Sequence, residues 1–173
     1  MRRAVTIFAV GAALAGLAFG IFASADAPKE QYGVFDGTNP TVYDQQTHLE
    51  WQRWPERWLT PDGGAGDAGS NGTIRTSQGL ATQRCAAFGP GWRLPTVKEL
   101  QTLVDEEPHR LYDAGAITYR WVDRNAFPET EREPYWTSST TNDGRIWTVH
   151  FGTGKPMAVQ PSDTHFGRCV KAR

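Results

Sequence analysis

The stretch GWRLPTVKEL, residues 91–100, decides where the second helix of this chain begins. Thr96 and Glu99 have the spacing of a capping box, in which the Thr96 hydroxyl accepts a hydrogen bond from the Glu99 amide and the Glu99 carboxylate accepts one from the Thr96 amide. These bonds satisfy donors that the first turn of a helix leaves without partners. Pro95 stands just before the box, where an extended backbone is needed. The stretch also supplies the fold motif that we expect to anchor the connection between two helices: Trp92, Arg93, Leu94, Pro95, Thr96 and Glu99.

The N-terminus has the pattern of an export signal. Arg2 and Arg3 precede an apolar run over residues 4–23, and the small residues Ala23-Ser24-Ala25 follow at the spacing that a signal peptidase accepts. We therefore expect cleavage between Ala25 and Asp26, a periplasmic or secreted mature chain, and no membrane attachment after cleavage. The alternative is an uncleaved anchor, because about 18 to 20 apolar residues can just span a bilayer.

Residues 26–173 have the length of one domain with its own core. We expect residues 26–40 to be a loosely ordered segment and residues 41–173 to form the domain. The chain carries 18 basic and 19 acidic side chains, so removal of the segment with Arg2 and Arg3 leaves a net charge of −3. This balance argues against a nucleic-acid partner, because binding to phosphate needs a basic surface.

Cys85 and Cys169 are the two cysteines of the chain, and both lie in the part expected to be exported. In an oxidising compartment such a pair favours a disulfide bond. The chain-entropy model assigns roughly 4 to 5 kcal/mol, as an upper value, to a bond that closes a loop of this size. Two separate buried thiols are the alternative. A metal site lacks support, because no further Cys or His lies at ligand spacing.

The pattern of apolar residues predicts an α+β domain. A first helix is expected from a cap at Thr76 or Ser77 to Gly89, with Cys85 on its buried stripe. The second helix is expected to run from Thr96 to about residue 105. Short strands are expected at residues 41–44, 49–52, 135–139, 146–151, 157–160 and 167–171. Four tryptophans fall at strand or motif positions and are expected in the core: Trp51, Trp92, Trp136 and Trp147.

Residues 106–134 show no clear periodicity and are expected to form a long ordered loop. Trp121 is its expected exposed aromatic residue, and tyrosine and arginine side chains flank it. An amphipathic ring beside arginine donors is typical of a surface that recognises a sugar or a peptide. The alternative is a tryptophan that only plugs the structure. The candidate ligand-binding residues are Tyr119, Arg120, Trp121 and Arg124.

Several blocks of the sequence, taken in order, resemble the Lcl C-terminal domain family, an exported bacterial domain of mostly unassigned function. The blocks are Val42-Tyr43-Asp44, Leu49-Glu50-Trp51-Gln52, Trp92-Arg93-Leu94-Pro95-Thr96, Tyr135-Trp136-Thr137-Ser138-Ser139, Trp147-Thr148-Val149-His150-Phe151 and Arg168-Cys169-Val170. The resemblance implies a C-type lectin-like fold, with two helices against small antiparallel sheets. It also implies a disulfide between the first helix and the last strand, which would join Cys85 to Cys169.

Calcium-dependent sugar binding of the usual lectin kind is not expected. Its motifs are Glu-Pro-Asn and Trp-Asn-Asp, whereas here Glu133-Pro134 precedes Tyr135, and Trp147 precedes Thr148. We expect no cofactor, with calcium as an alternative at the glycine-rich segment 61–72, which holds Asp and Asn residues. A polyanionic ligand is also disfavoured, because residues 105–133 carry eight acidic residues and four arginines. Such a ligand would be repelled unless the arginines gather on one face.

Our leading hypothesis is an exported, non-enzymatic recognition domain that binds a glycan or a protein on the cell surface or envelope through residues 106–134. One alternative is a cell-envelope hydrolase that uses His48 or His150 with a nearby carboxylate. The sequence contains neither an H-E-x-x-H zinc helix nor a G-x-S-x-G nucleophile elbow. Another alternative is a structural envelope component that associates with itself as a homo-oligomer.

Overall fold

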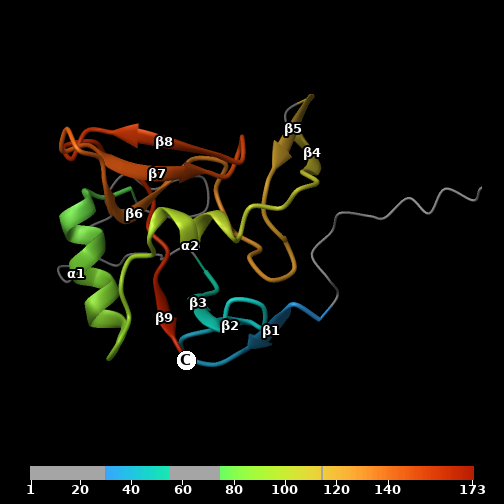
Figure 1. Ribbon diagram of the computed structural model, residues 1–173. Helices are drawn as coiled ribbons and strands as arrows, with labels where there is room; N and C mark the ends of the chain where they lie inside the picture. The colour runs from blue at the N-terminus through green and yellow to red at the C-terminus, as the bar shows by residue number, and fades with distance from the viewer. Residues whose placement is uncertain (1–29, 55–74, 114) are drawn as a thin grey trace, which may run out of the picture.

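The computed structural model describes residues 30–54, 75–113 and 115–173 (Figure 1). This part of the chain is an α+β domain, as the sequence predicts. Its elements are β1 (Tyr32–Phe35), β2 (Thr41–Asp44), β3 (Leu49–Gln52), α1 (Gln78–Phe88), α2 (Val97–Gln101), β4 (His109–Asp113), β5 (Ala116–Arg120), β6 (Pro134–Thr140), β7 (Ile146–His150), β8 (Lys155–Val159) and β9 (Val170–Ala172). The expected signal peptide, its cleavage site and the glycine-rich segment 61–72 lie outside the described residues.

The described strands form two larger antiparallel sheets and a separate hairpin. One sheet has the order β1-β2-β3-β9, the other has the order β6-β7-β8, and β4 pairs only with β5. Strand β9 begins at Val170, later than expected, and pairs with β3 so that Trp51 lies opposite Val170. In Figure 1 the two larger sheets lie on opposite sides of α2, and the β4–β5 hairpin lies at the end remote from α1.

Strand β1 lies within residues 26–40, which we expected to be loosely ordered. It pairs along its whole length with β2, with Tyr32 opposite Asp44 and Phe35 opposite Thr41. The Tyr32 ring meets Phe127 edge to face at 5.4 Å, which ties the strand to the core. The order therefore comes from contacts with distant residues, and the local composition gives no sign of them.

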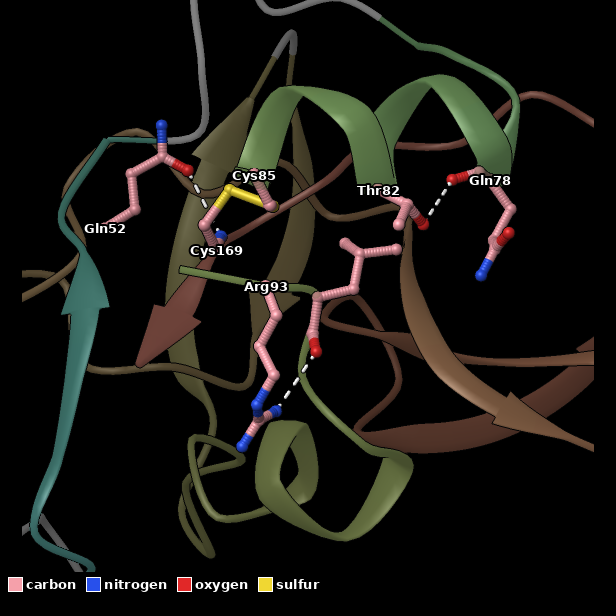
Figure 2. Close-up of a disulfide and its surroundings, with 7 residues drawn as sticks. Gln52, Gln78, Thr82, Cys85, Arg93 and Cys169 are labelled. Carbon is pink, nitrogen blue, oxygen red and sulfur yellow. Dashed lines mark hydrogen bonds between the residues drawn. A yellow bond between two sulfur atoms is a disulfide. The ribbon is translucent and has the colours of Figure 1, made fainter. Parts of the chain in front are cut away.

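The disulfide between Cys85 and Cys169 is confirmed, with a Cα–Cα distance of 5.3 Å (Figure 2). Helix α1 carries Cys85 and begins at the predicted Ser77 cap, whose hydroxyl accepts from the Leu80 amide. The Cys169 amide donates to Gln52 Oε1 at 3.1 Å. The disulfide thus joins α1 to the segment that leads into β9.

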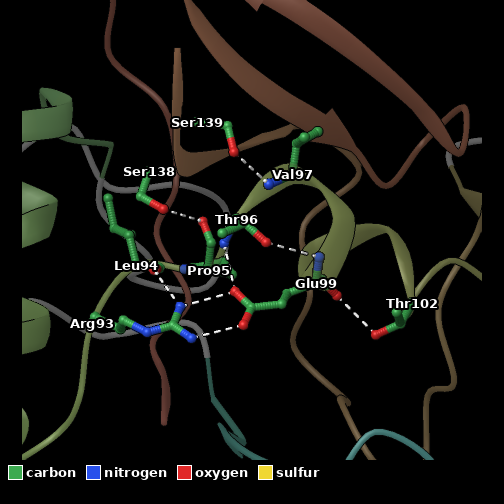
Figure 3. A network of polar contacts seen from close by, with 9 residues as sticks. All are labelled: Arg93, Leu94, Pro95, Thr96, Val97, Glu99, Thr102, Ser138 and Ser139. Atoms are coloured by element: carbon green, nitrogen blue, oxygen red, sulfur yellow. Dashed lines mark hydrogen bonds and ion pairs between the residues drawn. The ribbon is translucent and has the colours of Figure 1, made fainter. Parts of the chain in front are cut away.

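The capping box at Thr96 and Glu99 is confirmed in both directions (Figure 3). The Arg93 guanidinium donates two bonds to the Glu99 carboxylate, at 2.7 and 2.8 Å. These bonds hold the pKa of Glu99 at about 2, below its usual range. Ser139 Oγ accepts from the Val97 amide at 3.0 Å, so the start of α2 is also fastened to β6.

Helix α2 is shorter than predicted and ends at Gln101. The Thr102 hydroxyl donates to the Glu99 carbonyl, and the next two amides bond three residues back, to Leu100 and Gln101. The chain then turns so that the Asp105 amide can donate to the Trp121 carbonyl. Acidic residues at this helix end are opposed by the helix dipole, in agreement with an early end.

Two clusters form the core of the described residues. The larger joins both larger sheets with α2, and the smaller surrounds the disulfide between α1 and β6. Trp51, Trp92 and Trp136 are buried as predicted, but Trp147 is only half-buried. Along β7, Thr148 and Val149 are both buried and point to opposite faces, so both faces of this strand are covered.

Residues 106–134 are not a loop throughout, because they contain the β4–β5 hairpin. Gly115, with a φ of 84°, makes the turn that joins its two strands. This left-handed backbone conformation favours glycine. The tyrosines, Ile117 and Thr118 that flank this glycine were a strand signal that the expectation of a loop overlooked.

Candidate functional site

The β4–β5 hairpin places alternate side chains on two different faces. Arg110 lies opposite Tyr119, and Tyr112 lies opposite Ile117. Residues directly opposite in an antiparallel pair share a face, as do residues two apart along a strand. These four residues therefore share one face, which we call the outward face.

The outward face is exposed and largely apolar. Tyr112 is 77% exposed, Ile117 51% and Tyr119 42%, and the Arg110 side chain is also exposed. Tyr112 is the most exposed large hydrophobic residue in the described part of the chain. Within that part, no hydrogen bond or ion pair engages the Arg110 side chain. The largest exposed apolar patch of a folded domain is often an interaction surface.

The opposite face of the hairpin is turned toward the body of the domain and holds the hairpin in place. His109 Nε2 lies 3.3 Å from a carboxylate oxygen of Asp105, whose side chain is only 5% exposed. Across the hairpin, Arg120 Nη1 donates to the Pro128 carbonyl at 3.1 Å. These contacts tie both strands to flanking segments at the end of the hairpin remote from its turn, where His109 lies opposite Arg120.

The four candidate residues do not share one surface. Tyr119 lies on the outward face, whereas Arg120 belongs to the opposite face of the same strand. Trp121 is half-buried, and its ring lies against Gly154. Arg124 is exposed in the turn that follows. Trp121 is thus not the exposed aromatic residue that we expected in this region. The most exposed aromatic residue here is Tyr112.

Arg124 and Arg132 lie near Arg120, the half-buried arginine on the opposite face of the hairpin. Burial, followed by the nearby charge of Arg124, lowers the pKa of the Arg120 guanidinium, and Arg132 adds to the effect. Glu131 lies close enough to act in the opposite direction. Arg110 lies on the other face of the hairpin, so the arginines do not combine into one basic surface.

The two histidines considered for catalysis have structural contacts. His48 Nδ1 lies 2.9 Å from the Tyr43 hydroxyl, and His150 Nδ1 accepts from the Gly152 amide at 3.0 Å. Within residues 30–54, 75–113 and 115–173, neither imidazole forms a hydrogen bond or ion pair with a carboxylate. General acid–base catalysis by these histidines therefore has no geometric support in this part of the chain.

Neither a metal-binding cluster nor a membrane-spanning helix is present in the described residues. The described part of the chain has no group of three or more His, Cys, Asp or Glu side chains placed to hold a metal ion. Neither of its helices has the length and apolar character that a membrane span requires.

The class of protein follows from these features: a small α+β domain with one disulfide and an exposed aromatic hairpin. Comparison with family models matches residues 40–171 to the Lcl C-terminal domain. The chain belongs to the Lcl C-terminal domain family. A comparison with curated proteins found no match.

Proposed function

We propose that this protein is an exported, non-enzymatic recognition domain with a C-type lectin-like fold. Its outward face, formed by Arg110, Tyr112, Ile117 and Tyr119, binds a glycan or protein of the cell surface or envelope. The binding needs no cofactor. The binding site lies within residues 106–134, and its central aromatic contact is Tyr112 in place of Trp121.

The single observation that carries the proposal is the outward face itself. Burial of apolar area is the main favourable term in folding, and a large ring left 77% exposed contributes little to it. Tyr112, Ile117 and Tyr119 are exposed together and in register, beside an arginine without an acidic partner in the described residues. Tyr and Arg are the residue types that dominate binding surfaces.

Export is supported by two independent features. The Cys85–Cys169 disulfide suits an oxidising compartment, where such bonds form and persist. The N-terminal sequence has the basic residues, apolar run and small residues of a signal peptide.

The experiment compares surface binding by matched variants. Fluorescently labelled protein, expressed from the full sequence, is incubated with intact bacterial cells and counted by flow cytometry. Tyr112→Ala is expected to lose at least about tenfold in bound protein, the size of effect typical of a central aromatic contact. Met157→Ala is the control, because Met157 is 43% exposed on β8, outside the hairpin. Equal binding by Tyr112→Ala and the unchanged protein would remove the outward face from the proposal.

A further inference from the structure

We infer that the outward face binds one neutral sugar ring of a larger glycan, stacked against Tyr112 and Tyr119. The inference rests on the proposed function and names the ligand class for the same site.

The face is too small for a stable protein interface. Its two cross-strand rows are two residues apart, which is about 7 Å along a strand, and the strands themselves are about 5 Å apart. Four side chains of these types offer on the order of 400 Å² of contact area. A stable protein interface buries about 800 Å² on each partner, with roughly 20 to 30 residues a side. The area suits a single ring, and a second copy of this chain would need a surface beyond the hairpin.

The side chains match the two chemical characters of a sugar ring. A pyranose has C–H groups on its faces and hydroxyl groups around its rim. The rings of Tyr112 and Tyr119 supply flat apolar contact with a polar tip, and Ile117 extends the apolar floor between them. Arg110 has donors but no acceptor, so it suits the lone pairs of the rim hydroxyls. Tyrosine loses little conformational entropy on binding, because it has only two rotatable side-chain bonds.

The charges around the hairpin favour a neutral ligand over an anionic one. Among the described residues of the hairpin, Arg110 is the one charged group on the outward face. The surrounding residues 105–133 carry twice as many acidic residues as arginines. Arg120 is turned to the opposite face and donates to Pro128. A polyanion would therefore meet one cation in an acidic neighbourhood, whereas stacking of a neutral ring depends little on charge.

The test uses defined sugars and reads the site directly. Methyl glycosides of glucose, galactose, mannose and N-acetylglucosamine are titrated into isotopically labelled protein, and backbone amide shifts are followed by NMR. At least one sugar is expected to move amides of residues 109–120. The affinity should change less than about twofold between low and high salt, because no ion pair is made. Tyr112→Ala should weaken that binding at least tenfold, while Tyr112→Phe, which keeps the ring, and Met157→Ala should retain it.

Three outcomes would overturn the inference. One is no hairpin shift with any of the four sugars, and another is shifts that map away from the hairpin. The third is glucuronate binding more than tenfold tighter than every neutral sugar, which would make the ligand an acidic one. The cell-binding experiment separates this failure from failure of the proposed function. If cells still require Tyr112 while no sugar binds, the recognition role stands and the ligand class is wrong; if neither depends on Tyr112, both are wrong.

Discussion

The ring of Trp121 lies directly over Gly154, so a Cβ atom placed at residue 154 would be 3.0 Å from the ring. The same atom would be 3.1 Å from Val104 Cγ1, and Gly154 has a φ of 68°. The contact connects the segment after β5 to the turn between β7 and β8. It explains why Trp121 is half-buried. Trp121 therefore packs within the structure, whereas Tyr112 and Tyr119 are exposed.

Gly154→Ala is expected to destabilise the protein by about 1 to 3 kcal/mol, from overpacking and a strained backbone. Gly144→Ala is the matched control, because Gly144 has a φ of 82° but no atom within 4 Å of an added Cβ. Urea unfolding of the two variants measures the difference, which isolates the contact with Trp121 and Val104. Equal losses of unfolding free energy in the two variants would show that contact with Trp121 and Val104 adds nothing to the cost of Gly154→Ala.

Trp121→Ala is expected to lower stability, whereas Tyr112→Ala is expected to lower binding and leave stability nearly unchanged. Trp121→Ala should lower the free energy of unfolding by about 2 kcal/mol or more, because it removes a large packed ring. Tyr112→Ala should change it by less than about 0.5 kcal/mol, since the ring is largely exposed. Thermal unfolding and the cell-binding assay, run on both proteins, compare stability with binding. Undiminished stability with lost binding in Trp121→Ala would restore Trp121 as a contact residue.

Glu99→Gln removes the ion pair with Arg93 while a glutamine can still complete the capping box. The expected loss is about 0.5 to 1 kcal/mol near neutral pH, as for a partly exposed ion pair. The pKa of Glu99 is lowered from 4.5 to about 2, so its contribution is present above pH 4.5 and is lost as the pH falls toward 2. The stability difference between the variant and the unchanged protein should therefore shrink over that range. A difference that stays constant from pH 6 to pH 2 would contradict the assignment.

Arg168→Met is expected to cost about 3 to 5 kcal/mol, because it strips hydrogen bonds from buried acceptors. The Arg168 side chain is fully buried and donates to the Gln52 and Arg53 carbonyls and to Thr130 Oγ1, at 2.7, 2.8 and 2.6 Å. Burial lowers the pKa of this guanidinium to about 10. Arg110→Met is the control, and denaturant unfolding should find its stability unchanged.

Replacing both cysteines, as Cys85→Ala with Cys169→Ala, is expected to lower stability by about 2 to 5 kcal/mol. Thiol titration of the unchanged, denatured protein without reductant should find no reactive thiol from this pair. A reductant should lower the melting temperature of the unchanged protein and leave that of the double variant as it is. Reactive thiols before reduction would contradict the bond.

The local parts of the fold could be predicted because short-range chemistry determines them. The Thr96–Glu99 box and the Ser77 cap depend on residues three positions apart, so their spacing in the sequence was sufficient. The C-terminal end of α2, at Gln101, could not be predicted from residue spacing. After α2 ends, the Asp105 amide donates to the Trp121 carbonyl, 16 residues along the chain, and that contact exists only in the folded chain.

The candidate site was predicted only as a region. Tyr119 was identified, but Tyr112, Ile117 and Arg110 were missed because the hairpin that unites them was read as a loop. The signal that could have revealed it was the glycine turn between two β-prone segments.

By itself, the sequence determined the α+β class, the caps, the cysteine pair and the family, because each depends on residue type and spacing. Only the tertiary structure decided which aromatic residues are exposed. Trp121 and Tyr119 are two positions apart in the chain, yet packing against Gly154 half-buries one ring, while the hairpin turns the other outward. Burial depends on which distant segments pack together, and spacing along the chain does not specify those contacts.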